Sequence, residues 1–442
     1  MLATEILAGG AAALQQAALP AAVIHHAKRA VIDWYASVYP GLDCAVVGLL
    51  QEVVAENLDL GDATIVGGRR ATARAAALVN GTAAHAAEID DSFRDAMYHP
   101  GAATIAAALA AGQQADADGL RFLRAVVTGY EVSTRIGVAL GRAHYRYWHN
   151  TGTVGTFGAA AAVGSVLGLD ARRFAHALAT AATFAAGLQQ AFRMDSMSKP
   201  LHAGRAAEAG VLAATLAARG VTGSLDVLDG EDGLGRAMSD DVAWAGVGAT
   251  LGEDFHITRL TFKNHIGCGH AFAAIDGALA LQRRHALAVD DIAAVRVSTY
   301  KPALDIACYL NPATANEARF SLRYVVATAL VHGSVRLTAY EPTRLDDPKT
   351  RALMERIEVA VDPEIDRAFP DRRAARIEVT TAGGRTLDHF QPNRKGDPEE
   401  PLTDREVAGK FLELAAPRLG PERAEGLLAR LWDLEQAKSL HW

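Results

Sequence analysis

The chain has 442 residues and a formal net charge of −7, and 50% of its residues are hydrophobic although only 6% are aromatic. A chain of this length usually forms more than one hydrophobic core, so we expect two domains. The acidic balance, a pI near 6.1 and the absence of any lysine or arginine run argue against a nucleic acid as partner.

The sequence carries no signal for export or for the membrane. Glu5 stands where a signal peptide would need positive charge, and later apolar runs are interrupted by charges or glycines. The three cysteines, Cys44, Cys268 and Cys308, are too scattered for a disulfide framework. We therefore expect a cytoplasmic protein with reduced cysteines.

From about residue 20 to 260, apolar residues recur at helical spacing, and Gly, Asp or Asn opens or closes the segments. The predicted helices include residues 21–39, 72–91, 103–115, 120–140, 155–169, 172–188 and 203–220. The alanine and glycine content of these segments predicts close helix packing.

Alternating apolar residues then predict strands at 291–300, 356–362 and 375–390, the last with a Gly-Gly hairpin, and a helix at 316–333 lies between the first two strands. A polar linker follows at 393–407, and helices return after it. The predicted fold is mainly α: a large all-helical domain (1–262, completed by 397–442) with an inserted smaller α+β domain at 263–396.

A dense polar cluster, HAAEIDDSFRDAMYHPGAA, covers residues 85–103. On a continuous helix, His85, Glu88 and Ser92 share one face, and the helix should end before His99 because a proline follows it. Asp90, Asp91 and Asp95 are expected to point away from that face, and Asp90 and Asp91 are expected to be structural on the opposite side of the helix. The cluster is either a solvated helix end or a site for proton transfer near neutral pH.

A second cluster, SMSKPLHAGRAAEAG, places Lys199, His202 and Arg205 at three-residue steps from the start of a helix. Cationic groups beside the free N–H groups of a helix N-terminus form an anion site. The alternative is an exposed basic turn.

A third cluster, TFKNHIGCGHAFAAIDG, opens the α+β segment with Lys263, His265, Cys268 and His270. Its spacing allows a zinc site, but no fourth ligand is present locally, and a nucleophilic Cys268 lacks an identified base. Carboxylate binding or proton transfer by Lys263 and the two histidines explains the residue types more simply, and purely structural histidines remain an alternative.

A fourth stretch places Tyr145, Tyr147 and His149 before a helix with glycines at three-residue spacing. This is not the dinucleotide-binding spacing and no strand precedes it, so we interpret the glycines as packing residues and the tyrosines as candidate donors. Neither a phosphate-binding loop nor a nucleophile elbow occurs, so no cofactor and no metal are expected.

Taken together, these stretches resemble the MmgE/PrpD family over about residues 5 to 435. The resemblance is carried by ALVNGTAAHAAEIDDSF followed by HPG, GYEVSTRIG, WHNTGTVGTFGAAAA and SMSKPLHAGRAAEAGVLAATLAARGVTG. The best-known activities of this family are 2-methylcitrate dehydratase, cis-aconitate decarboxylase and iminodisuccinate epimerase. The resemblance implies a helical domain with a smaller lid domain, an active site between them, a homodimer, and no metal or organic cofactor.

The motifs of decarboxylase-like members imply the following site residues: Glu88, Ser92, His99, Lys199, His265 and Tyr324. Glu88 and Ser92 stand where that branch has Asp and Thr. The loop up to His99 is longer than in that branch, and this loop and the run ending at Tyr145 resemble the epimerase more closely. Either His265 or His270 is the lid histidine.

The sequence thus predicts a lyase acting on a small di- or tricarboxylate by proton transfer next to a carboxylate. In this hypothesis Lys199, Arg205 and Lys263 hold carboxylates, His99 and a lid histidine exchange protons, and Tyr145 or Tyr324 is a donor. An epimerase of an iminodisuccinate-like substrate and a non-catalytic helical binding protein are the alternatives.

Overall fold

A computed structural model of the chain describes residues 1–194 and 196–442. It divides into two compact units, one formed by Met1–Phe262 with Thr403–Trp442 and the other by Lys263–Leu402. The predicted fold class is confirmed, because the chain is mainly helical and its sheets are small.

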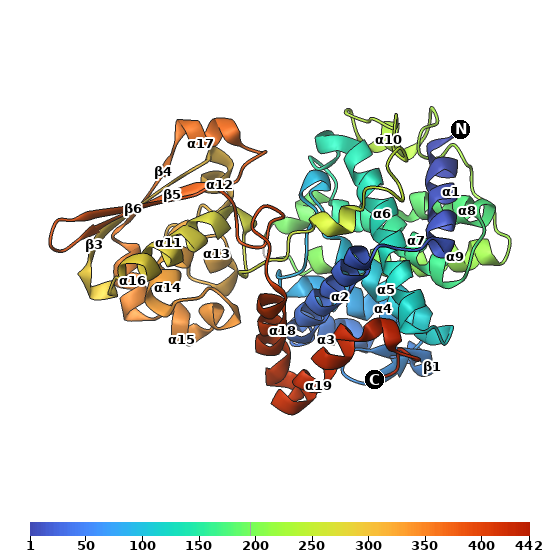
Figure 1. Cartoon of the computed structure of the whole chain (residues 1–442), viewed down its shortest axis with the longest axis horizontal. Coiled ribbons are helices and arrows are strands. Elements are labelled where there is room, and N and C mark those ends of the chain that lie inside the picture. The colour runs from blue at the N-terminus through green and yellow to red at the C-terminus, as the bar shows by residue number, and fades with distance from the viewer. Residues whose placement is uncertain (195) are drawn as a thin grey trace. The chain divides into compact units, whose positions relative to one another are not determined.

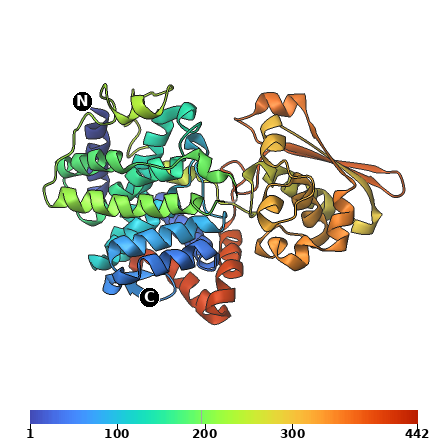
Figure 2. The same cartoon turned by 180° about the vertical axis from the view of Figure 1, so that it is seen from behind.

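The first unit is built from packed helices and one short hairpin (Figures 1 and 2). Its elements are α1 (Ala3–Gln16), α2 (Ala21–Gly41), α3 (Ala45–Val53), β1 (Leu58–Ile65), β2 (Arg69–Ala71), α4 (Ala73–Ala86), α5 (Pro100–Gln114), α6 (Gly119–His144), α7 (Asn150–Val166), α8 (Ala171–Phe184), α9 (Lys199–Ala218), α10 (Leu234–Met238), α18 (Asp404–Leu419) and α19 (Pro421–Trp432).

Helix α7 forms the centre of this unit, since each of its residues is buried. It packs against α5, α6, α8 and α9. A Cβ atom added to Gly152 would lie 2.3 Å from the carbonyl oxygen of Ala186, and one added to Gly158 would lie 2.5 Å from Oγ1 of Thr104. These glycines therefore allow the close helix contacts that the composition predicts.

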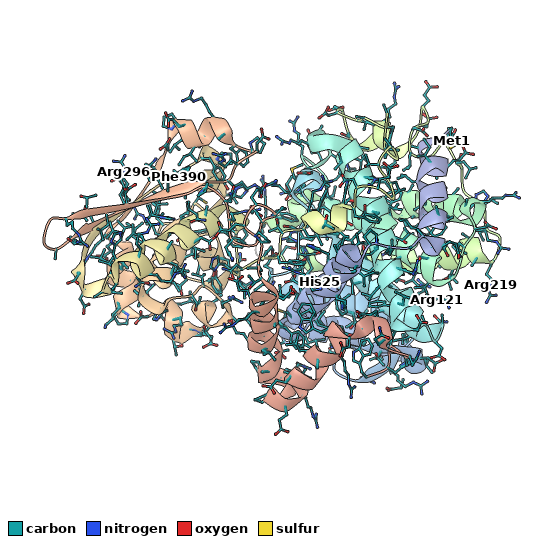
Figure 3. The ribbon with its side chains drawn as sticks, viewed as in Figure 1. Met1, His25, Arg121, Arg219, Arg296 and Phe390 are labelled. Carbon is teal, nitrogen blue, oxygen red and sulfur yellow. The ribbon has the colours of Figure 1, made fainter. Side chains whose placement is uncertain are left out.

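The C-terminal helices complete the first unit. Helices α18 and α19 lie beside α2, although most of the sequence separates them (Figure 1). His25, labelled in Figure 3, lies on α2 with its Nε2 3.0 Å from a carboxylate oxygen of Asp404 on α18. Deeper between the two helices, Nζ of Lys410 lies 2.5 Å from Oδ1 of Asp33, and both side chains are fully buried.

Two parts of the predicted helical region form other structures. Residues 58–71 form the antiparallel hairpin β1–β2, whose register shifts between Leu58 and Ala63, so the expectation of an all-helical domain is wrong there. A glycine inside the irregular strand Leu58–Ile65 weakens the alternation that would have revealed it. Residues 239–262 contain turns and one 3-10 helix, His256–Arg259.

The second unit is a four-stranded sheet with helices. Its elements are α11 (Phe272–His285), β3 (Ile292–Thr299), α12 (Lys301–Ile306), α13 (Ala315–Arg319), α14 (Leu322–His332), α15 (Pro342–Leu345), α16 (Pro348–Met354), β4 (Ile357–Val361), α17 (Pro363–Ala368), β5 (Ala375–Thr381) and β6 (Thr386–Gln391). The strand order is β4-β3-β5-β6, with β3 and β4 parallel and the other pairs antiparallel.

The three predicted strand segments are confirmed, and the last is the hairpin β5–β6. Helix α11 packs against this hairpin, whereas Arg296 and Phe390, labelled in Figure 3, are exposed. The helix predicted at 316–333 is divided into α13 and α14, because the Ser321 side chain caps a new helix by accepting from the N–H of Tyr324.

Among the described residues, no single helix is long and apolar enough to cross a membrane. The pair α1 and α2, bent by 101° at their junction, meets the length and composition requirement jointly.

Candidate active site

The chain leaves helix α4 at Ala86, earlier than predicted. Glu88 follows with a left-handed backbone φ of 60°, which turns the chain away from the helix axis. The prediction that His85, Glu88 and Ser92 share one helical face is therefore wrong. Ser92 pairs instead with Thr261 in an antiparallel bridge, in which each N–H donates to the other residue's carbonyl oxygen at 2.9 Å.

The same turn brings Asp90 into the histidine cluster. Its Oδ2 lies 2.7 Å from Nδ1 of His85 and 3.3 Å from Nδ1 of His99, and the Asp90 and His85 side chains are buried. The expectation that Asp90 and Asp91 point away from the site is wrong for Asp90, because no helix continues through this segment. The carbonyl oxygen of Ile89 accepts from Nζ of Lys410 at 2.8 Å, so α18 supports this turn.

Asp91 holds the start of helix α5. Its Oδ1 accepts from the N–H of Gly101 at 3.0 Å, and its Oδ2 accepts from the hydroxyl of Tyr130 at 2.7 Å. Burial, with a further contribution from the charge of Asp33, raises the pKa of Asp91 to about 8. Its backbone carbonyl oxygen lies 2.7 Å from Nδ1 of His99, so Asp91 also orients that ring.

His99 lies at the N-terminus of α5, where Pro100 begins the helix, and its side chain is 20% exposed. Because a carbonyl oxygen only accepts, the bond to Asp91 places a proton on Nδ1. In the neutral ring, Nε2 then carries the lone pair. In this tautomer, a neutral His99 offers Nε2 as a general base.

Two further histidines extend the cluster. His149, at the start of α7, stacks on His85 with ring centroids 5.4 Å apart, and its Nδ1 lies 3.0 Å from Nδ1 of His202 on α9. Burial, followed by the charges of His85 and Lys199, holds the pKa of His149 well below its usual value and lowers the pKa of His202 to about 4. Both rings are therefore neutral near pH 7.

Lys199, the first residue of α9, forms an ion pair with Glu88, and both side chains are about one-fifth exposed (18% and 20%). Its Nζ also lies 4.8 Å from the ring centroid of Phe192. Burial acts to lower the pKa of Lys199, but the Glu88 carboxylate outweighs it, with a smaller contribution from Tyr145, and the pKa lies above its usual value. Lys199 is therefore a cation near pH 7.

The predicted anion cluster is only partly assembled. Arg205 is exposed and forms an ion pair with Glu208, and the neutral His202 adds no charge. His202 and Arg205 line an open pocket of about 520 Å³ together with five residues of the preceding loop, namely Ala186, Gly187, Leu188, Gln190 and Ala191. His202 thus connects the histidine cluster with this pocket.

The remaining predicted site residues belong to the second unit. Nε2 of His265 lies 2.8 Å from Oδ1 of Asp276, and Nδ1 of His270 lies 2.9 Å from the hydroxyl of Tyr300. Lys263 is buried, and the buried Tyr324 donates its hydroxyl to the carbonyl oxygen of Ala339. The roles of these four residues stay predictions.

One group of side chains could hold a metal ion. The ligand atoms of His85, Asp90 and His99 lie within 4.8 Å of one another, and two imidazoles with a carboxylate suit zinc. In the part of the chain that the structure describes, the zinc alternative at His265, Cys268 and His270 forms no such group.

Reasoning from sequence missed Asp90, Asp276 and Phe192 as site neighbours and left His149 without a role. The local signals for Asp90 and His149 were their places beside other polar residues in HAAEIDD and WHN. Phe192 reaches Lys199 through a 3-10 helix, Gln189–Phe192, that no sequence pattern predicts.

A mainly helical chain with a Lys–Glu pair beside a histidine cluster has the residue types of an enzyme that performs acid–base chemistry on an anion. Comparison of the sequence with models of known families identifies one family. The chain belongs to the MmgE/PrpD family: the model of the MmgE/PrpD N-terminal domain matches residues 5–246, and that of the C-terminal domain matches residues 265–434.

Several known proteins are similar to the chain. A cis-aconitate decarboxylase-like protein of Aspergillus oryzae is 29% identical over 96% of this chain and 92% of its own length. The cis-aconitate decarboxylase of Mus musculus is 28% identical over 83% of this chain and 77% of its own. A 2-methylcitrate dehydratase of Cupriavidus necator is 30% identical over 38% of this chain and 37% of its own. These relatives support a lyase-type enzyme.

Proposed function

We propose that the protein is a lyase that acts on a small di- or tricarboxylate through proton transfer at the carbon next to a carboxylate. The observation that carries this proposal is the proximity of one cation, Lys199, to a histidine cluster in which His149 and His202 are neutral and the Nδ1 of His99 is bonded to a carbonyl oxygen. The decarboxylase and dehydratase relatives support the same substrate class.

Proton removal next to a carboxylate needs a base and a positive charge, because the electron pair left on carbon spreads onto the carboxylate oxygens. In the proposed reaction, Nε2 of His99 takes the proton and Lys199 pairs with the carboxylate. The ion pair with Glu88 keeps Lys199 charged and in place. Tyr145, which contributes to the pKa of Lys199, is the candidate hydrogen-bond donor in this unit.

The intermediate has several outcomes. Loss of hydroxide from the neighbouring carbon gives an alkene, and protonation of the opposite face gives an epimer. Loss of CO2 from the substrate produces a related carbanion, which then takes up a proton. Residues Ser92, His85, Arg205, Lys263, His265, His270 and Tyr324 stay in the hypothesis as binding or proton-carrying groups.

The test is proton NMR in D2O with 2-methylcitrate, cis-aconitate and iminodisuccinate. A lyase gives an alkene or CO2 from one of the first two substrates. Deuterium uptake without loss of iminodisuccinate would favour the epimerase alternative. If the protein leaves all three compounds unchanged and without deuterium, the proposed function is contradicted, and a binding protein becomes the better hypothesis.

The variant His99→Gln keeps a polar side chain of similar length but removes the base. We expect it to lower the rate by about 10²- to 10⁴-fold, the range for a general base. The control is His285→Asn, since His285 is an exposed residue at the end of α11 in the other unit. Equal rates for His99→Gln and the control would contradict the role of His99.

No cofactor is part of this proposal, and activity is expected without added organic groups. The homodimer and the cytoplasmic location also stay predictions. Light scattering during size-exclusion chromatography measures the mass of the particle, which is 46.6 kDa for one chain.

A further inference from the structure

The second unit contains a buried pair formed by a carboxylate and an imidazole. Oδ1 of Asp276 lies 2.8 Å from Nε2 of His265, and the two side chains are 8% and 3% exposed. A carboxylate oxygen accepts, so the proton of a neutral His265 lies on Nε2. The lone pair is then on Nδ1.

Nδ1 of His265 is itself buried, and within the described residues it makes no hydrogen bond. The amide nitrogen of Asn264 lies 3.5 Å from Nε2, on the nitrogen already paired with Asp276. Leaving a buried acceptor without a partner costs about 1–3 kcal/mol. Such groups are rare in folded proteins, and one explanation for them is a role in chemistry.

Asp276 is held rigidly from two sides. Its Oδ2 accepts from the backbone N–H of Lys395 at 2.8 Å. Its helix, α11, packs closely against the hairpin β5–β6. A Cβ atom added to the next residue, Gly277, would lie only 2.9 Å from Cγ1 of Ile377, so the glycine allows this close packing. The carboxylate therefore stays fixed while it orients the imidazole.

The neighbouring His270 has a different environment. Its Nδ1 lies 2.9 Å from the hydroxyl of Tyr300. Burial, followed by the charges of Arg373 and Arg394, lowers the pKa of His270 to about 3. The geometry of His270 fits a structural hydrogen bond, whereas that of His265 fits a proton carrier.

We propose that Asp276 is a positioning residue that fixes His265 as the tautomer with Nε2–H, so that Nδ1 exchanges a proton with the substrate. This inference rests on the proposed function. While His99 takes the proton from the substrate carbon, His265 in its imidazolium form gives the proton on Nδ1 to the departing hydroxyl or to the opposite face of the carbanion. The ring then returns to the neutral form with Nε2–H, and the carboxylate of Asp276 stabilises the imidazolium before this transfer. Glu400 lies near this carboxylate and Lys395 contacts it through its backbone N–H, and Glu400 is itself near Lys395 and His389.

The tautomer is measured by 15N NMR of the whole protein labelled at histidine, with His265→Gln to assign the signal. We expect the wild-type ring to be protonated at Nε2. Asp276→Asn should move a large part of the proton to Nδ1, because an amide can donate to Nε2. Asp276→Glu should restore Nε2–H in part. An unchanged tautomer in Asp276→Asn would overturn the proposal.

The second measurement is the rate of the NMR reaction against pH. Asp276→Asn should lower kcat by about 10- to 100-fold, the range for outer partners of a functional histidine, with little change in KM, and should shift the acidic limb of the pH profile. The matched control is Asp347→Asn, which removes a carboxylate 3.2 Å from Nε2 of His332 in the same unit. Equal losses in both variants, or an unshifted profile, would refute a positioning role.

The two measurements separate this inference from the proposed function. If the wild-type protein converts none of the three substrates, the proposed function fails, while the tautomer experiment still tests the effect of Asp276 on His265. If Asp276→Asn does not fold, the tautomer of His265 in wild type and in Asp276→Glu tests the proposal instead. A wild-type ring protonated at Nδ1 excludes the proposed tautomer.

Discussion

Nδ1 of His149 and Nδ1 of His202 lie 3.0 Å apart, so one ring donates and the other accepts. This contact needs one proton between the two facing nitrogens. It is therefore compatible with two neutral rings and is lost when both rings become cations. The lowered pKa values of the two histidines agree with this requirement.

The first prediction concerns acid stability. Because the pKa of His202 falls from 6.5 to about 4 on folding, the folded protein binds fewer protons than the unfolded chain between these pH values. The contribution of His202 to stability should therefore be complete above pH 6.5 and decrease as the pH falls through this window. Thermal unfolding at pH 7 and at pH 4.5 measures the effect. The Tm of His202→Asn should fall by less between these pH values than the Tm of wild type, and an equal fall would contradict the prediction.

The second prediction concerns the cation of the site. Lys199→Met removes the charge beside Glu88 but keeps an unbranched side chain, and we expect kcat/KM to fall by roughly 10²- to 10³-fold, the cost of losing one charge-stabilising group. Steady-state kinetics on the substrate identified by NMR measures this effect.

The matched control is Lys28→Met. Nζ of Lys28 lies 2.8 Å from Glu435 in the same unit, and its side chain is 12% exposed, close to the 18% of Lys199. The control should lose stability but keep its catalytic constants. A similar loss of kcat/KM in both variants would show that Lys199 acts through the fold alone.

The third prediction uses Asp91. Its pKa rises from 3.8 to about 8 on folding, so between these values the folded protein holds a proton that the unfolded chain has released. This contribution favours folding below pH 4 and is lost as the pH rises through 8. The Tm of wild type relative to that of Asp91→Asn should decrease from pH 5 to pH 8. A constant difference in Tm would exclude a raised pKa of Asp91.

The fourth prediction concerns metal ions. Zn²⁺ bound by His85, Asp90 and His99 would occupy the proposed base, so micromolar Zn²⁺ should inhibit, EDTA should restore activity, and His85→Gln should weaken the inhibition. Mg²⁺ prefers oxygen ligands and serves as the control. Loss of activity on EDTA treatment of the purified enzyme would show instead that a metal is required.

Much of the fold follows from patterns within short segments. The strands at Ile292–Thr299 and Ala375–Thr381 alternate clearly, and α9 begins at the lysine before Pro200, as predicted. The end of α4 could not be predicted, because it depends on the left-handed backbone of Glu88, a residue that rarely adopts this conformation.

The site was predictable in its residue types but not in its pairs. His99 and Lys199 were found because each stands beside a proline at a helix start. The partners of the histidines depend on tertiary packing: Asp276 lies eleven positions from His265, and His202 lies 53 positions from His149. No periodicity connects residues at such separations.

The ion pair between Lys410 and Asp33 has a consequence for the synthesis of the chain. The two residues are 377 positions apart, and the same ammonium group donates to Ile89 beside the histidine cluster. On the ribosome, the whole second unit emerges before Lys410 does. The interior of the first unit therefore stays incomplete until α18 has been translated, and a chain truncated before α18 should be a substrate for chaperones and proteases.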